Sequence, residues 1–106
     1  MLPSITPTEL HDELLGPTPP TVIDVRESHE LAISSLEGSI HIPLSELTGK
    51  LGGLHKDDKF VILCRVGGRS AQATAYMMQR GFTNVRNLTD GINGWARTVD
   101  RSMSEY

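Results

Sequence analysis

The stretch that decides the fold is "FVILCRVGGRSAQATAYMMQRG", residues 60–81. Its first five residues, 60–64, are all apolar, as is typical of a strand buried on both faces of a sheet. An alanine-rich segment at 70–81 predicts a helix that Gly81 is suited to end. The face of this helix predicted to be buried carries Ala71, Thr74, Ala75 and Met78. We therefore expect a strand, a short loop and a helix in direct succession.

Other segments add strands on either side of this unit. "TVIDV", residues 21–25, is apolar except for Asp24, which predicts a strand in the middle of a parallel sheet. "FTNVRNL", residues 82–88, is a third candidate, and a brief extended piece ends at Pro43. Strands separated by helices are typical of an α/β domain whose parallel strands are joined by right-handed crossovers.

The clearest helix start lies near the N-terminus. Thr6 is suited to be the N-cap residue, and Pro7 is suited to be the first helical residue. Glu9 can complete a capping box with Thr6, and Gly16 marks the end of the helix. These agreeing signals predict a helix over residues 7–15.

Three weaker elements complete the predicted order. We expect a short helical turn within 28–37 capped by Ser28, a weak helix capped by Ser45, and a closing turn or helix at 90–96. Trp95 supplies the closing element with a large apolar anchor. The tail from about residue 100 is expected to be frayed.

Composition limits the domain organisation and the partners. The 106 residues suit one compact domain over 1–106, and 38% of them are hydrophobic. Ten basic against 13 acidic residues give a net charge of −3 without long runs of either sign, which predicts no binding to nucleic acid or membrane surfaces. With no export signal, no apolar span and only one cysteine, the chain is expected to be a soluble cytoplasmic protein that needs no disulfide.

The single cysteine, Cys64, lies where the strand meets the loop. Ligands of open α/β sheets bind beyond the carboxyl ends of strands. The loop consists of Arg65, Val66, Gly67, Gly68 and Arg69, and Ser70 opens the helix. Because the two glycines permit unusual backbone angles, the loop amides can turn inward, and the helix N-terminus favours negative charge. We therefore expect a cradle that lowers the pKa of Cys64 below its ordinary value of about 8.5, with help from the two arginines if they face the sulfur.

An inert role for Cys64 is the simpler alternative. A cysteine that follows an apolar strand is more often a buried packing residue than a nucleophile. The reactive interpretation is favoured because several features occur together. These are a strand end, a sole cysteine, paired glycines, Arg69 and a serine that opens the helix.

The same loop resembles the active-site loop of the rhodanese family, whose pattern is close to C-R-x-G-x-R-S. Cys64, Arg65, Gly67, Arg69 and Ser70 meet all of its fixed positions. The resemblance extends to "VIDVRE" at 22–27, "IHIPLSEL" at 40–47 and "RGFTNVRNLTDGINGW" at 80–95.

The resemblance implies a fold and an activity. The fold would be a rhodanese-like, five-stranded, mostly parallel sheet flanked by helices on both faces. Cys64 would carry a persulfide while sulfur passes from thiosulfate to cyanide or a thiol. Separately from the resemblance, we expect neither a cofactor nor a metal. The chain departs from the family pattern at residues 34–39, at His41 and at Asp90. These departures bear on substrate approach and local packing more than on the sulfur chemistry.

Asp24 and Arg26 match the family's "DVR" motif. We expect them to form a structural ion pair rather than to act in catalysis, since a buried charge needs a partner. The four histidines show no metal-ligand spacing with the single cysteine, although His41 can approach Cys64 in space as a possible base.

Three functions compete at this stage. In a sulfurtransferase, Arg65 or Arg69 would hold the sulfonate group of the donor. The loop amides would bind the transferred sulfur atom. A persulfide carrier or interaction module would instead receive sulfur from a relay protein, without significant turnover. A cysteine phosphatase or arsenate reductase is the third, but such loops resemble C-x5-R, whereas four residues separate Cys64 from Arg69. The smaller loop suits a sulfur atom better than a phosphoryl group.

Overall fold

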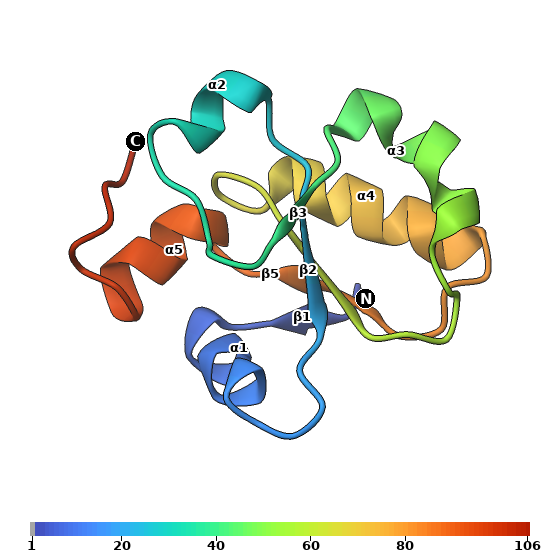
Figure 1. Cartoon of the computed structure of the whole chain (residues 1–106), viewed down its shortest axis with the longest axis horizontal. Helices are drawn as coiled ribbons and strands as arrows, with labels where there is room; N and C mark the ends of the chain where they lie inside the picture. Colours follow the sequence, from blue (N-terminus) through green and yellow to red (C-terminus); the bar gives the residue numbers. More distant parts are fainter. Residues whose placement is uncertain (1) are drawn as a thin grey trace.

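The structure, a computed structural model, describes residues 2–106 and contains a five-stranded sheet (Figure 1). The strands are β1 (Ser4–Ile5), β2 (Thr21–Asp24), β3 (Ile40–His41), β4 (Phe60–Leu63) and β5 (Val85–Leu88). Their order in the sheet is β1-β5-β4-β2-β3, and every neighbouring pair is parallel. The predicted α/β class with five strands is thus confirmed, and the described sheet is entirely rather than mostly parallel. β4, which leads to Cys64, is the central strand.

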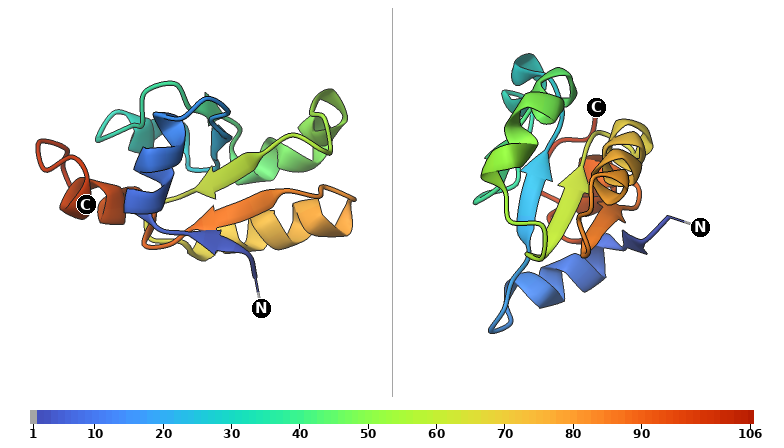
Figure 2. Two further views of the ribbon diagram at one scale, coloured as in Figure 1. Left: turned by 90° about the horizontal axis from the view of Figure 1, so that it is seen from below. Right: turned by 90° about the vertical axis from the view of Figure 1, so that its right-hand side faces the viewer.

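Helices connect the strands and cover both faces of the sheet. They are α1 (Pro7–Leu14), α2 (Ser28–Leu31), α3 (Leu44–Lys50), the 3₁₀ helix η1 (Leu51–Gly53), α4 (Gly68–Gln79) and α5 (Gly91–Thr98). Figure 2 shows α4 running alongside β4 and β5, which it contacts. α1 and α5 lie against each other on the opposite face. None of these helices has the length and apolar character needed to cross a bilayer.

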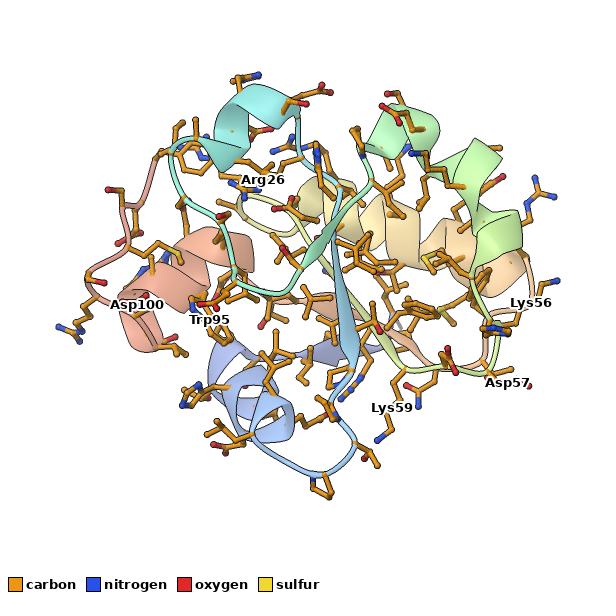
Figure 3. The ribbon with its side chains drawn as sticks, viewed as in Figure 1. Arg26, Lys56, Asp57, Lys59, Trp95 and Asp100 are labelled. Atoms are coloured by element: carbon orange, nitrogen blue, oxygen red, sulfur yellow. The ribbon has the colours of Figure 1, made fainter. Side chains whose placement is uncertain are left out.

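Alternation along β4 separates two cores. Phe60, Ile62 and Cys64 lie in the core under α3 and α4, while Val61 and Leu63 lie in the core under α1 and α5. Trp95 anchors the second core from α5, close to α1 (Figure 3), as the sequence predicts. Cys64 therefore belongs to the same side of the sheet as the helix that follows it.

The strongest local signals form as predicted. Thr6 caps α1 and forms the capping box with Glu9: the Glu9 amide donates to Thr6 Oγ1 at 3.2 Å, and the Thr6 amide donates to Glu9 Oε1 at 2.9 Å. Gly81 follows α4 with a φ of +92°, and the Phe82 amide donates to the Met77 carbonyl at 3.1 Å. This last bond is typical of a glycine-terminated helix end.

The predicted buried face of α4 is confirmed at Thr74, but its other three positions are wrong by one or two residues. The buried residues are Ser70, Ala73, Thr74 and Met77, while Met78 is 42% exposed. Hydrogen bonds explain the difference, because Thr74 Oγ1 donates to the Ser70 carbonyl at 2.8 Å and Ser70 Oγ bonds to Cys64. Satisfied hydroxyls can be buried at low cost, so Ser70 and Thr74 lie on the buried face of the helix.

The two predicted serine caps are also wrong. α2 begins at Ser28 itself and has Glu27 as its N-cap residue, whose amide donates to Glu30 Oε2 at 2.8 Å. α3 begins after Pro43, so Ser45 lies inside the helix. α2 starts at the predicted cap and α3 one residue before it, so neither serine occupies the N-cap position.

The chain end differs from the expected frayed tail. Met103 and Tyr106 pack against the core under α1 and α5, and the Met103 amide donates to the Asp100 carbonyl at 3.1 Å in a turn. The C-terminal residue lies close to α2 (Figure 1), where the Tyr106 hydroxyl donates to Glu30 at 2.7 Å. Tertiary contacts far away in the sequence hold this segment, so local composition alone does not predict its order.

Candidate active site

Cys64 is the residue immediately after β4, and its sulfur faces the start of α4. The Gly67 amide lies 3.1 Å and the Ser70 amide 3.4 Å from Cys64 Sγ, and Ser70 Oγ lies 3.3 Å away. The loop and helix start that the sequence singles out thus surround the sulfur with donors. The side chain itself is only 1% exposed.

Two glycines allow this geometry. Gly67 has a φ of +110° and is the N-cap residue of α4, a left-handed conformation that side chains other than glycine's rarely tolerate. A Cβ at Gly91 would lie 2.4 Å from the carbonyl oxygens of Cys64 and Arg65. The space is needed because the amide of Ile92 donates to the Cys64 carbonyl at 2.9 Å, and the next amide of α5 donates to the Arg65 carbonyl. With their carbonyls bound by α5, the loop residues turn their amides toward the sulfur.

This environment favours the thiolate. Burial raises the pKa of Cys64, but the Ser70 hydroxyl and the amides of Ser70, Gly67 and Val66 donate to the sulfur and outweigh it. The net result is a pKa below the ordinary value of a cysteine thiol. The largest contributions to the lowering come from the hydrogen bonds with Ser70, Gly67 and Val66.

Asn87 is a site residue that the sequence analysis missed. Its Nδ2 donates to the Gly67 carbonyl at 3.3 Å, and its Oδ1 accepts from the Ser70 hydroxyl. Since a hydroxyl has one proton, Ser70 either donates to Asn87 or rotates to donate to Cys64 Sγ. The sequence holds one signal for Asn87. It is a polar residue two positions after buried Val85, and therefore on the same face of β5.

The two loop arginines are held by other partners. Arg69 donates to both carboxylate oxygens of Glu30, at 2.7 and 2.9 Å, and this pairing lowers the pKa of Glu30 well below its usual range. Arg65 Nε donates to the main-chain oxygen of Tyr106. The arginines therefore border the site without pointing at the sulfur, and Glu30 and Tyr106 are further residues that the sequence analysis missed. No local sequence pattern indicates this carboxylate next to the loop, because Glu30 and Arg69 lie 39 positions apart in the sequence.

The rest of the predicted loop shapes the surface of the site. Val66 is 58% exposed at the tip of the loop, and Gly68 is the first residue of α4 with open space around it. Only Gly67 of the glycine pair has a positive φ.

Asp24 and Arg26 form a fully buried ion pair. Arg26 donates through Nε and Nη2 to the Asp24 carboxylate, with the shortest distance 2.6 Å, and both side chains are 0% exposed. Arg26 lies beside α2 (Figure 3). It also donates to the carbonyls of Glu30 and Ser34 and to the Tyr106 hydroxyl. The pair thus ties the end of β2 to the segment that follows it, in the structural arrangement expected of a buried charge.

The histidine alternative gains no support from geometry. His41 Nε2 lies 2.7 Å from the Arg26 carbonyl, whereas the hydrogen-bond partners of Cys64 Sγ are Gly67 and Ser70. Across residues 2–106 there is no cluster of three His, Cys, Asp or Glu side chains of the kind that holds a metal ion.

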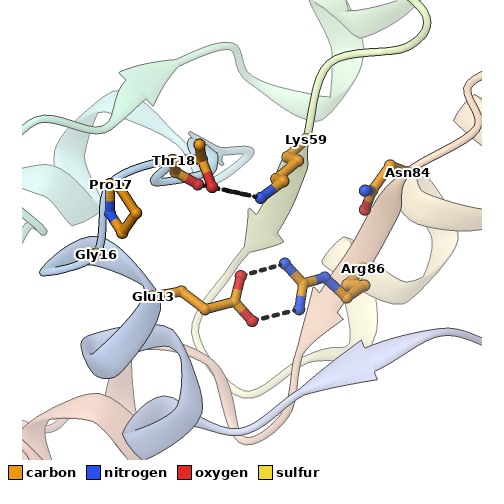
Figure 4. Close-up of a pocket in the computed structure, with 7 residues that line it drawn as sticks. All are labelled: Glu13, Gly16, Pro17, Thr18, Lys59, Asn84 and Arg86. Carbon is orange, nitrogen blue, oxygen red and sulfur yellow. Dashed lines mark hydrogen bonds and ion pairs between the residues drawn. The ribbon is translucent and has the colours of Figure 1, made fainter.

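A separate hollow lies at the opposite end of the sheet. Its lining consists of Glu13, Gly16, Pro17, Thr18, Lys59, Asn84 and Arg86 (Figure 4). Its charges are engaged, since Arg86 donates to Glu13 at 2.7 and 2.8 Å and Lys59 donates to Thr18 at 2.9 Å. Lys59 precedes β4 and Cys64 follows it, so the strand separates this hollow from the sulfur.

A family model described as the Rhodanese-like domain matches residues 6–98. The chain belongs to the rhodanese-like domain family. Because the match extends from α1 to the end of α5, it contains the whole sheet except β1 and all of the loop around Cys64. The resemblance noted in the loop sequence thus extends over most of the chain.

Individual rhodanese-like relatives agree with this assignment. The chain is 38% identical to a protein named "Sulfurtransferase" from Allochromatium vinosum, covering 72% of this chain and 71% of that protein. It is 35% identical to "Putative sulfur carrier protein YrkF" from Bacillus subtilis, covering 70% of this chain and 40% of that protein. Among longer curated relatives, the chain spans 20 to 35% of their length.

A solved structure shows the same fold. The crystal structure of a rhodanese-related protein from Thermoplasma volcanium is 36% identical, with a TM-score of 0.83, and covers 92% of this chain and 93% of that one. The rhodanese-like architecture therefore holds across nearly the full length of both chains.

Proposed function

We propose that this chain is a sulfurtransferase that carries sulfane sulfur as a persulfide on Cys64, with thiosulfate as donor and cyanide or a thiol as acceptor. The observation that carries the proposal is the position of Cys64 Sγ, 3.1 Å from the Gly67 amide and 3.4 Å from the Ser70 amide at the start of α4. A persulfide is an anion, so it benefits from the same donors as the thiolate. The relative from Allochromatium vinosum named a sulfurtransferase supports the reaction class.

The reaction consists of two displacements at sulfur. The Cys64 thiolate attacks the outer sulfur of thiosulfate, the S–S bond of the donor breaks, and sulfite leaves with the bonding pair. Cyanide or a thiolate then attacks the terminal sulfur of the persulfide, and the Cys64 thiolate returns as leaving group. Arg65 or Arg69 holds the sulfonate oxygens once it exchanges its present partner for the donor. No net oxidation and no cofactor is required.

A persulfide carrier is the second candidate. Cys64 is 1% exposed, which suits sulfur that is protected from solvent until a partner protein arrives. The Bacillus subtilis relative named a putative sulfur carrier supports this form of the function. A sulfur-relay protein would then be donor or acceptor, and a reducing cytoplasm would keep the single cysteine available.

A cysteine phosphatase or arsenate reductase is disfavoured. Four residues separate Cys64 from Arg69, one fewer than in the C-x5-R loops of those enzymes. A phosphoryl group transferred to the cysteine brings its oxygens into the loop and needs a larger ring of amides than a single sulfur atom does.

The test measures the intact mass of the protein before and after thiosulfate, with Cys64→Ser alongside. The expected result is a gain of one sulfur atom, about 32 Da, that is absent in the variant and removed by cyanide with release of thiocyanate. Repeated thiocyanate formation indicates an enzyme, whereas a single loading without turnover indicates a carrier. Absence of the adduct with both thiosulfate and a persulfide-bearing protein contradicts both candidates.

A further inference from the structure

The C-terminal residue returns to the active-site end of the molecule and is clamped there by Asn93. The Tyr106 amide donates to Asn93 Oδ1 at 3.1 Å, and Asn93 Nδ2 donates to the Tyr106 main-chain oxygen at 2.8 Å. Asn93 belongs to α5, whose first turn also holds the carbonyls of Cys64 and Arg65. The same helix turn thus fixes the active-site loop and the end of the chain.

The Tyr106 side chain makes a second set of contacts. Its hydroxyl accepts from Arg26 Nη1 at 2.9 Å and donates to Glu30 Oε1 at 2.7 Å. Its ring lies 5.2 Å from the guanidinium carbon of Arg65, within the range of a cation–π contact. The tyrosine therefore links α2, α5 and the loop after β4.

These contacts engage both arginines that could bind an anionic donor. Arg65 is occupied by the ring and the main-chain oxygen of Tyr106. Arg69 is occupied by Glu30, which Tyr106 also contacts. An anion that approaches Cys64 meets no free loop arginine until Tyr106 moves.

We infer that Tyr106 is a gate residue that sets the selectivity of the site, because it covers Arg65 and restricts small anionic sulfur donors more than neutral reagents. This inference rests on the proposed function for its biological meaning. An anion can displace the tyrosine, since its oxygens form charge-assisted hydrogen bonds with the Arg65 guanidinium in place of the contacts with Tyr106. A neutral reagent gains nothing from Arg65, so the gate does not affect it in the same way.

The test compares two alkylating reagents on Cys64: iodoacetate, which is an anion, and iodoacetamide, which is neutral and of similar size. Rates are measured by mass spectrometry for the wild type, Tyr106→Ala and Asn93→Ala. The ratio of the iodoacetate to the iodoacetamide rate cancels changes in the exposure and pKa of the thiol. We expect this ratio to rise at least about fivefold in both variants, as Arg65 becomes free to attract the anion.

Tyr76→Ala is the matched control. Tyr76 also stacks on an arginine, with its ring 4.9 Å from the guanidinium carbon of Arg80, but it lies on α4 away from Arg65. The ratio of the iodoacetate to the iodoacetamide rate in Tyr76→Ala should equal that of the wild type. An unchanged or lowered ratio in Tyr106→Ala overturns the gate, and this variant decides the matter even if Asn93→Ala, which alters a buried side chain, does not fold.

Thiosulfate loading of the same proteins separates the two proposals. A raised alkylation ratio without any persulfide overturns the sulfurtransferase function and leaves the gate. Persulfide formation with an unchanged ratio overturns the gate alone. Faster loading of Tyr106→Ala by thiosulfate, together with the raised ratio, supports both.

Discussion

Ser70 Oγ lies 3.3 Å from Cys64 Sγ and at the same time donates to Asn87. The amide oxygen of Asn87 and the ionised sulfur therefore compete for the single hydroxyl proton, which goes to one of them at a time. Together with the Gly67 and Ser70 amides, it decides how readily Cys64 becomes a thiolate. Changes at these residues should be visible as shifts in the ionisation of the cysteine.

We expect Ser70→Ala to raise the pKa of Cys64. The hydroxyl stabilises the charged form, so its loss makes ionisation harder, by about one pH unit for one hydrogen bond. The midpoint of the pH dependence of iodoacetamide alkylation measures this shift. Ser45→Ala, inside α3, is the control and should leave the midpoint in place. A midpoint in Ser70→Ala equal to that of the wild type would show that the amides alone stabilise the thiolate.

We expect Asn87→Asp to raise the pKa of Cys64 as well. The new carboxylate holds the Ser70 proton more strongly and repels the thiolate, and both effects disfavour ionisation. The same alkylation profile gives the midpoint, which should exceed that of wild type by about one unit or more. Asn84→Asp, just before β5 at the opposite end of the strand, serves as control. Equal shifts in the two variants would indicate a general charge effect rather than the Ser70 link.

Glu30→Gln should destabilise the fold in a pH-dependent way. Pairing with Arg69 lowers the folded-state pKa of Glu30, so its contribution is present above the unfolded value near 4.5 and is lost as the pH falls through the folded value. Because the Arg69 side chain is 36% exposed, we expect a loss of only about 1–2 kcal/mol at pH 7. Urea unfolding at pH 7 and at pH 3 or below should show the difference from wild type shrinking at low pH. Glu105→Gln, from the exposed pair with Arg97, is the control, and a constant difference across pH would contradict the assignment.

Gly91→Ala should disturb the loop most severely among the glycine substitutions. Its Cβ would meet the carbonyl oxygens of Cys64 and Arg65 at 2.4 Å, and the φ of +58° adds strain. We expect a loss of about 2–4 kcal/mol in the free energy of unfolding, together with slower alkylation of Cys64. Gly49→Ala, inside α3 with open space around it, should instead be neutral or stabilising by up to about 1 kcal/mol. Equal stability of the two variants would show that the loop and α5 adjust freely.

Many features were predictable because their causes are local. The Thr6 cap of α1 and the Gly81 end of α4 depend on residues within a few positions of each other. The buried face of α4 was predicted correctly only at Thr74, because the hydrogen bonds of Ser70 and Thr74 outweigh the count of apolar residues. The order of the tail was missed because Tyr106 is held by Arg26, 80 residues away.

The sequence by itself determined that Cys64 follows a buried strand and precedes a glycine loop, so that amides three and six residues further along reach its sulfur. Such contacts need only the backbone conformation of one short segment. Only the tertiary structure decided where the charges of the site point. Parallel packing of the strands gathers their carboxyl ends at one edge of the sheet, and there Arg69 meets Glu30 and Arg65 meets Tyr106. Long arginine side chains reach whichever partner the fold brings closest, and residues far apart along the chain supply those partners.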